Sequence, residues 1–287
     1  MGNALSQLKN IARLCGWPGT FVATLFFCSS LYAAPASLDL SAETAYSDNL
    51  SLTPDKRDNP LSGMHSKVSA TLRKTRVVSE SFSVLGEIGL GYHRFHIDHP
   101  ADYWSANATI AANYRPFADY TAPYFKLSLS ARRKEYNNEF HPDWNLRTRF
   151  SLNKHWSPRV FTSIGLAARE GHDEWPVVDT VNFGYWDTSQ RELFLGMDWR
   201  FKNFIAYGLL SRTEGDLIWT FTRGDKYVGG LWADDSRIDE LKLGVNFPVS
   251  SSGALDVLAR FSQVSFKGQK MHDESGLSLA YIHRFSL

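Results

Sequence analysis

Two arginines at a spacing of two have side chains that could bind an anion. Arg147 and Arg149 alternate with Leu146 and Phe150 in the segment DWNLRTRFSLNKHW, residues 143–156. Successive side chains of an extended strand point to opposite faces, so both guanidinium groups share one face. A pair of guanidinium groups on one face is suited to binding carboxylates or phosphates.

Other segments place basic side chains on a polar face in the same way. Lys126 and Arg132, for example, alternate with Leu127 and Leu129. Nine residues of these faces are candidate anion-binding residues: Arg73, Lys126, Arg132, Arg147, Arg149, Arg169, Lys242, Arg260 and Arg284. With Lys67, Lys134 and Arg200 the faces hold twelve bases, an excess of five over seven acids: Asp39, Glu43, Glu87, Glu192, Asp198, Glu240 and Asp256.

Histidine is the other residue type here with catalytic or metal-binding chemistry. Six histidines lie in or beside connecting segments: His93, His96, His99, His141, His172 and His272. A lipid hydrolase would need a serine, a histidine and an orienting acid or amide, but no nucleophile signature lies near them. A spacing of three in an extended segment does not bring the side chains onto one face. We predict solvated loop histidines, and neither a cofactor nor a metal.

The elements that must position these side chains are strands. Most reach the length of about 10 residues that a tilted strand needs to cross a bilayer. Three long connections, near 48–64, 171–186 and 215–235, follow odd-numbered strands, and compact connections follow even-numbered ones. Alternation predicts twelve strands, at about residues 38–47, 65–76, 80–96, 103–115, 123–136, 143–154, 159–170, 187–201, 203–214, 236–247, 254–266 and 276–287.

A sheet of this kind can cross a membrane only as a closed barrel, because backbone amides cannot stay unpaired in hydrocarbon. Closure gives every strand a lipid face and a lumen face, and Arg147 turned to lipid would cost about 2–4 kcal/mol near the midplane. The sequence predicts an all-β fold, a closed antiparallel transmembrane β-barrel of about 12 strands over residues 37–287, with its bases inside. The orientation of the strand at 203–214 stays open, because NFIAYGLL is apolar on both faces.

The first residues predict export. Lys9 and Arg13 precede the apolar run GTFVATLFFCSSLYAA and the small residues APAS, which is typical of a signal peptide cleaved within residues 1–36. Both cysteines, Cys15 and Cys28, lie inside the segment to be removed, so the mature chain has no thiol chemistry. The formal net charge of +1 predicts neither nucleic-acid binding nor a basic membrane-surface patch.

The last strand carries a resemblance. GLSLAYIHRFSL, Gly276 to Leu287, puts Leu277, Tyr281 and Phe285 on one face. It resembles the carboxy-terminal targeting strand of bacterial outer-membrane β-barrel proteins, although it ends on leucine where that family usually ends on an aromatic residue. The resemblance implies that the barrel-assembly machinery is a partner of this strand. AYSDNLSLTPDKRDN, residues 45–59, resembles the first hairpin of exopolysaccharide-associated barrel porins.

The longest connection, EGDLIWTFTRGDKYVGGLWADD at residues 214–235, holds two short apolar runs around the turn RGDK. Each run is too brief to span a bilayer, so we expect the two to extend their neighbouring strands as a hairpin above the membrane. Its aromatic residues, Trp219, Phe221, Tyr227 and Trp232, suit either a lumen plug or a carbohydrate contact.

The interpretation is a bacterial outer-membrane channel. Its basic lumen would pass small anionic solutes or acidic oligosaccharides, because Lys and Arg lining a pore select anions. Two alternatives remain open at this point. One is a lipid-modifying hydrolase with its site at the extracellular rim, and the other is a non-conducting structural, assembly or polysaccharide-export barrel.

Overall fold

The computed structural model describes residues 36–48, 63–96, 102–136, 143–176, 183–223 and 226–287, and all of its regular structure is antiparallel strand. The described residues include no helix that is long and apolar enough to cross a membrane. The twelve strands are β1 (Ala36–Ser47), β2 (Gly63–Ser79), β3 (Phe82–Phe95), β4 (Tyr103–Tyr114), β5 (Tyr124–Tyr136), β6 (Asp143–His155), β7 (Val160–Pro176), β8 (Phe183–Arg200), β9 (Ile205–Arg223), β10 (Lys226–Pro248), β11 (Gly253–Phe266) and β12 (Gln269–Ser286).

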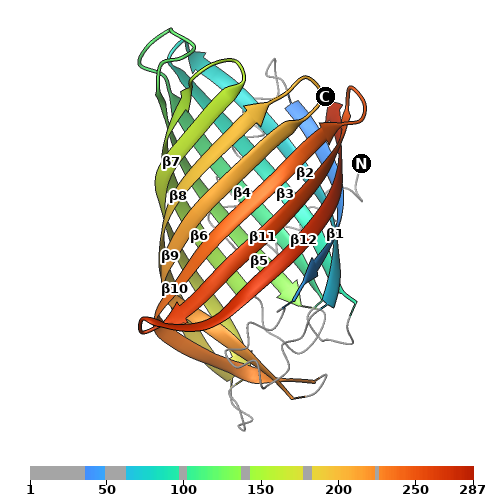
Figure 1. Cartoon of the computed structure of the whole chain (residues 1–287), viewed down its shortest axis with the longest axis vertical. Coiled ribbons are helices and arrows are strands. Elements are labelled where there is room, and N and C mark those ends of the chain that lie inside the picture. The colour runs from blue at the N-terminus through green and yellow to red at the C-terminus, as the bar shows by residue number, and fades with distance from the viewer. Residues whose placement is uncertain (1–35, 49–62, 97–101, 137–142, 177–182, 224–225) are drawn as a thin grey trace, which may run out of the picture.

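Each strand pairs with its neighbours in the chain, and β12 pairs with β1 to close the barrel. The predicted closed barrel of twelve strands is therefore confirmed, with short turns and the chain's end at one rim (Figure 1). Side chains fasten the closing seam at both ends. Arg284 donates two hydrogen bonds to Asp39, with N–O distances of 2.7 and 2.8 Å, and Ser47 donates one of 3.0 Å to Glu274.

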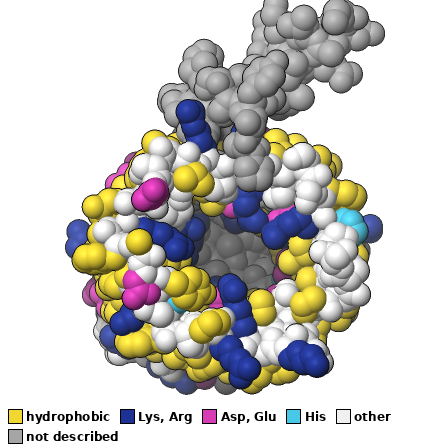
Figure 2. Space-filling view, turned by 90° about the horizontal axis from the view of Figure 1, so that it is seen from above, with side chains coloured by type: hydrophobic (Ala, Val, Ile, Leu, Met, Phe, Trp, Pro, Cys, Tyr) yellow, Lys and Arg dark blue, Asp and Glu magenta, His cyan; other side chains and the backbone are white. Residues whose placement is uncertain are grey.

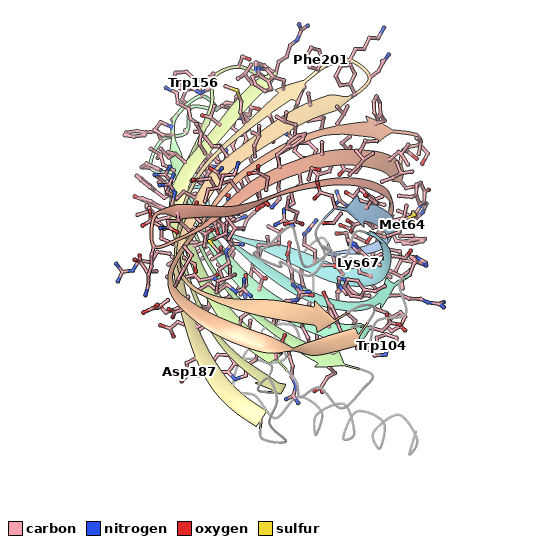
Figure 3. The ribbon with its side chains drawn as sticks, turned by 60° about the horizontal axis from the view of Figure 1, so that its bottom comes forward. Met64, Lys67, Trp104, Trp156, Asp187 and Phe201 are labelled. Atoms are coloured by element: carbon pink, nitrogen blue, oxygen red, sulfur yellow. The ribbon has the colours of Figure 1, made fainter. Side chains whose placement is uncertain are left out.

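The two faces of the sheet follow from alternation. Lys67 points into the lumen, whereas Met64 and Trp104 lie on the outside of the wall (Figure 3). Outward positions carry exposed apolar side chains along nearly every strand, including Leu90, Leu127 and Leu166. An exposed apolar band of this extent is suited to hydrocarbon rather than to water.

Pairing settles the orientation of β9, which its sequence left open. Ser211 lies opposite Phe194 of β8 and Glu240 of β10, both of which share the lumen face. Tyr207 and Thr213, at even spacing from Ser211, therefore face inward as well. The polar neighbours on both sides determine which apolar face of β9 turns to lipid.

Several strand ends differ from the prediction, among them the start of β12, which lies at Gln269 rather than at about residue 276. The connection expected at 171–186 is wrong, because β7 continues to Pro176 and β8 begins at Phe183. The extended hairpin expected at 214–235 is confirmed, since β9 and β10 run on to Arg223 and Lys226 beyond the other strands (Figure 1). A register shift at 233–236 includes Asp235, whose φ of 57° is unusual for a residue other than glycine.

An inward aromatic ring covers a glycine on the neighbouring strand. Tyr207 of β9 lies over Gly244 of β10, where a Cβ atom would stand 2.6 Å from the ring's Cε2. The hydroxyl of Tyr207 donates a hydrogen bond of 2.7 Å to Asp256. The missing side chain at Gly244 thus makes room for the ring, as in other sheets where an aromatic residue packs over a glycine.

Two predictions lie outside the described residues. One is the signal peptide predicted within residues 1–36, of which only residue 36 is described. Most of the stretch that resembles exopolysaccharide-associated porins falls within 49–62, and it is not described either.

Candidate functional site

The lumen contains a cavity of about 770 Å³. Basic side chains surround its opening when the barrel is seen from the short-turn rim (Figure 2). Hydroxyl and amide side chains provide most of the remaining polar lining: Ser69, Thr71, Ser105, Asn107, Thr109, Ser130, Asn145, Gln190, Ser211 and Thr213. A solute in this space would therefore meet both positive charge and many hydrogen-bonding groups.

Strand register places all nine candidate residues on the inner face. Six of them line the cavity itself: Arg132, Arg147, Arg149, Arg169, Lys242 and Arg260. Arg73, Lys126 and Arg284 lie on the same face nearer the short-turn rim. Their location agrees with the alternation of the sequence, whereas anion binding by them stays a prediction.

Two inward acids were missed by the sequence reasoning. Asp143 of β6 pairs with Lys134 at 2.6 Å, and Glu274 of β12 lies 3.6 Å from Arg260. Among the described side chains the lumen therefore has twelve bases and nine acids, an excess of three rather than the predicted five. Continuing the alternation of the last strand back from Gly276 would have found Glu274, because the two share a face.

One part of the inner surface, which we call the paired wall, consists of the inner faces of β10–β12 and β1–β3. Asp39 accepts from both Arg284 and Arg73, and Arg73 also bonds Glu87. Glu240 contacts Lys242 at 2.5 Å and Arg260 at 3.2 Å. Each described Lys and Arg of this wall lies within 4.0 Å of a carboxylate: Lys67, Arg73, Lys242, Arg260 and Arg284.

The opposite part, the basic wall, consists of the inner faces of β4–β7. It carries six bases: Lys126, Arg132, Lys134, Arg147, Arg149 and Arg169. Among the described side chains of these four faces the only carboxylate is Asp143, which is bound to Lys134. Arg147 forms an ion pair with Glu192 on the neighbouring strand β8. Arg132 donates a hydrogen bond of 3.3 Å to the hydroxyl of Tyr103.

Arg149 has an aromatic partner in place of an acid. Its guanidinium carbon lies 3.6 Å from the centre of the Phe194 ring, a cation–π contact. Phe194 is only 1% exposed and packs over Gly165, where a Cβ atom would stand 2.6 Å from the ring. The ring therefore contacts the arginine directly, and no described carboxylate forms an ion pair with it.

Of the two predicted loop histidines whose side chains are described, one differs from the prediction. His93 is not a solvated loop residue: it belongs to β3, is 8% exposed and stacks on Tyr103 with the ring centres 4.3 Å apart. The expected strand at 80–96 already contained His93, but its inward position and the contact with Tyr103 that buries it were not predicted. His96 is exposed and lies 2.6 Å from the Ser66 hydroxyl.

The other four histidines cannot be placed in the same way. His99 and His141 lie outside the described residues, as do the side chains of His172 and His272. Among the described residues no cluster of three or more His, Cys, Asp or Glu could hold a metal ion.

Comparison with known proteins supports the fold. No protein-family model and no curated protein match the sequence. An outer-membrane channel from Pseudomonas putida F1 is similar in structure, with 9% identity, a TM-score of 0.54, and coverage of 89% of this chain and 97% of that one. The β domain of the Bordetella autotransporter BrkA aligns at 11% identity and a TM-score of 0.48, covering 88% and 100%. The closed twelve-stranded barrel and its likeness to the Pseudomonas putida F1 channel show that the chain has the fold of the bacterial outer-membrane β-barrels.

Proposed function

We propose that this chain is a passive channel whose basic lumen passes small anionic solutes or acidic oligosaccharides across the outer membrane. The observation that carries the proposal is the basic wall, where Arg132, Arg149 and Arg147 lie along the cavity with one carboxylate, Glu192, in contact with them. Cations that line a narrow pore lower the cost of bringing an anion into it.

A barrel of this size has room for a solute. Eight strands enclose an interior that side chains alone fill, whereas sixteen or more leave a wide aqueous channel. Twelve strands lie between these limits, and the cavity of about 770 Å³ is consistent with that. The similar protein from Pseudomonas putida F1 is described as a channel, which is in keeping with the proposal.

Conduction also requires that the solute leave. The partners of the basic wall favour release, because Glu192 competes with a passing anion for Arg147 and the Phe194 ring shields one face of Arg149. Serine and asparagine side chains along the same cavity could replace water around a sugar or a carboxylate. An anion would move down its gradient through short-lived contacts of this kind.

The test is ion selectivity in a planar bilayer. Purified mature protein should give discrete conductance and a reversal potential that reports anion preference in a salt gradient. Replacing Arg132, Arg147 and Arg149 together by Gln should lower the anion-to-cation permeability ratio by about threefold or more, because three charges leave the pore.

A matched control removes three arginines from the outer face of the same barrel. Arg94, Arg133 and Arg191 point away from the lumen, and their replacement by Gln should leave the reversal potential unchanged. A silent bilayer would favour the non-conducting alternatives. Equal selectivity of the two triple variants would contradict the basic wall as the origin of anion preference.

A second arm distinguishes the two solute classes. An acidic oligosaccharide of uronic acids should interrupt the current through the wild-type channel, whereas a neutral oligosaccharide of equal length should not. Loss of the interruption in the lumen triple variant, with retention in the outer-face control, is the expected result. If only small anions pass and neither sugar has an effect, the oligosaccharide part of the proposal is wrong.

A further inference from the structure

A second basic cluster lies outside the lumen, at the short-turn rim. We define the turn-side patch as Lys154, Trp156, Arg159, Trp199, Phe201 and Lys202. These residues come from the β6–β7 and β8–β9 turns and the adjoining strand ends. The two turns lie side by side, because the backbone N–H of Arg200 donates a hydrogen bond of 2.7 Å to the carbonyl of Arg159 and Val160 pairs with Trp199.

The patch continues the lipid-facing band. Trp199 lies at an outward position of β8. The indole N–H of Trp156 donates a hydrogen bond of 2.9 Å to the hydroxyl of Thr162, which lies at an outward position of β7. Trp156 is 60% exposed and Phe201 55%, and both lie at the same end of the barrel (Figure 3). Aromatic side chains at such a boundary occupy the depth of the lipid headgroups.

Three cations accompany the aromatic rings without an acid beside them. Lys154 Nζ lies 4.0 Å from the centre of the Trp156 ring, and Arg159 and Lys202 are exposed in the two turns. Neither segment, 154–162 nor 199–204, contains Asp or Glu. The whole-chain charge of +1, which by itself predicts no basic membrane-surface patch, hides this local excess.

The opposite ends of the same strands have the reverse composition. Their outward and rim positions carry four acids and two bases: Glu170, Asp187, Glu214, Asp216, Arg191 and Arg212. Arg212 is moreover bound to Asp239 at 2.7 Å. The positive excess therefore belongs to one end of this part of the barrel and is not a general property of its outer surface.

From this polarity we infer that the turn-side patch binds the headgroup of an anionic phospholipid in the periplasmic leaflet. Barrels of this fold place their short turns and termini toward the periplasm, and phospholipids form the leaflet on that side. Lys154, Arg159 and Lys202 would contact phosphate oxygens while Trp156, Trp199 and Phe201 pack against the adjoining glycerol and acyl carbons. Anionic phosphatidylglycerol or cardiolipin suits three unpaired cations better than zwitterionic phosphatidylethanolamine does.

The experiment measures which lipid the intact mature barrel retains. Detergent-solubilised protein is mixed with equal amounts of phosphatidylglycerol and phosphatidylethanolamine, and bound lipid is counted by native mass spectrometry. The wild type should retain phosphatidylglycerol over phosphatidylethanolamine by about threefold or more. Replacing Lys154, Arg159 and Lys202 by Gln should abolish the preference, whereas the outer-face control at Arg94, Arg133 and Arg191 should keep it.

A fluorescence measurement locates the lipid independently. Brominated phosphatidylglycerol should quench tryptophan emission more than brominated phosphatidylethanolamine does, and Trp156→Phe should remove most of the excess. Equal retention of both lipids by the wild type would overturn the inference and leave a periplasmic protein as the occupant to test. Loss of preference in the control triple would overturn it as well, because the lipid would then lie at the other rim.

Discussion

The paired wall and the basic wall face one another across one lumen, and both are antiparallel sheet with alternating side chains. They differ in what accompanies their cations. In the paired wall Asp39, Glu87 and Glu240 hold the bases in place, whereas in the basic wall a hydroxyl, a ring and a carboxylate of β8 do so for Arg132, Arg149 and Arg147. Inward charge can therefore hold strands together or create an electrostatic field in the lumen, depending on the pairing across strands.

The largest effect is expected where the basic wall depends on packing. Phe194→Ala should lower the free energy of unfolding by about 3–5 kcal/mol, because it empties a buried ring site over Gly165. Urea unfolding in lipid vesicles measures it. Arg149→Gln is the matched control and should cost less than about 0.5 kcal/mol. If the two variants lose equal stability, the arginine has a structural role and the contrast between the walls fails.

The next effect belongs to the paired wall. Asp39→Ala removes the acceptor shared by Arg284 and Arg73, and should lower the free energy of unfolding by about 2 kcal/mol. This loss of stability is smaller than for a fully buried ion pair, because the Arg284 side chain is 54% exposed. The same urea titration applies. Reversal potentials of this variant should move far less than those of the triple arginine variant, and a larger shift would contradict the division of roles.

Glu192 is the residue through which the contrast can be sharpened. Glu192→Gln releases Arg147 from its carboxylate and should raise the anion-to-cation permeability ratio about twofold. Bilayer reversal potentials report the change. Glu87→Gln in the paired wall is the comparison, and its effect should be smaller because Arg73 keeps Asp39 as a partner. A lower ratio for Glu192→Gln would mean that the carboxylate positions Arg147 for conduction.

Tyr207→Phe should have a smaller effect. The hydroxyl of Tyr207 donates a hydrogen bond to Asp256, which also accepts one of 3.2 Å from the side-chain amide of Asn246. Removing the hydroxyl therefore leaves the carboxylate with the Asn246 bond. The expected loss is about 1 kcal/mol in the free energy of unfolding. The ring over Gly244 should keep its place, which the unchanged reversal potential would show.

The smallest effect is expected at a carboxylate outside both walls. The backbone N–H and the hydroxyl of Thr121 donate to Asp119 in the β4–β5 turn, and they lower the pKa of that carboxyl. A lowered folded-state pKa stabilises the turn above the unfolded pKa, and the contribution is lost as pH falls through the folded value. A carboxyl titration by NMR should show a higher pKa for Asp119 in Thr121→Val. An unchanged pKa would mean that the hydroxyl bond does not stabilise the charged form, because the backbone N–H bond is kept in this variant.

Alternation predicted the barrel because the bilayer separates the two faces of every strand so strictly. A lipid-facing Arg147 would be so costly that its face is determined by its neighbours Leu146 and Phe150 alone. Where both faces are apolar, as in β9, or where strands rise out of the bilayer, as at 171–186, that constraint is absent and the sequence pattern fails. The orientation of β9 then depends on partners from β8 and β10.

The site, too, could be predicted only in part from the sequence. Which bases face inward is a property of each strand and could be predicted, whereas which of them are paired depends on register between strands. Arg149 meets Phe194 across β7, and Arg284 meets Asp39 across 245 residues of sequence. No local pattern contains such contacts. The predicted excess of five charges was too high for two reasons. Asp143, the first residue of its expected strand, was left out of the inward acids, and Glu274 stood just before the expected start of the last strand.

The closing seam has a kinetic consequence. Its side-chain bonds join residues 227 and 245 positions apart, so nothing at the seam can form until the last strand has been delivered. Contacts of such long sequence separation are associated with slow folding, because a large loop must close before they give any stabilisation. A chain that lacks β12 would leave β1 and β11 as open sheet edges in hydrocarbon. The unpaired backbone groups of these edges would make such a fragment unstable in the membrane.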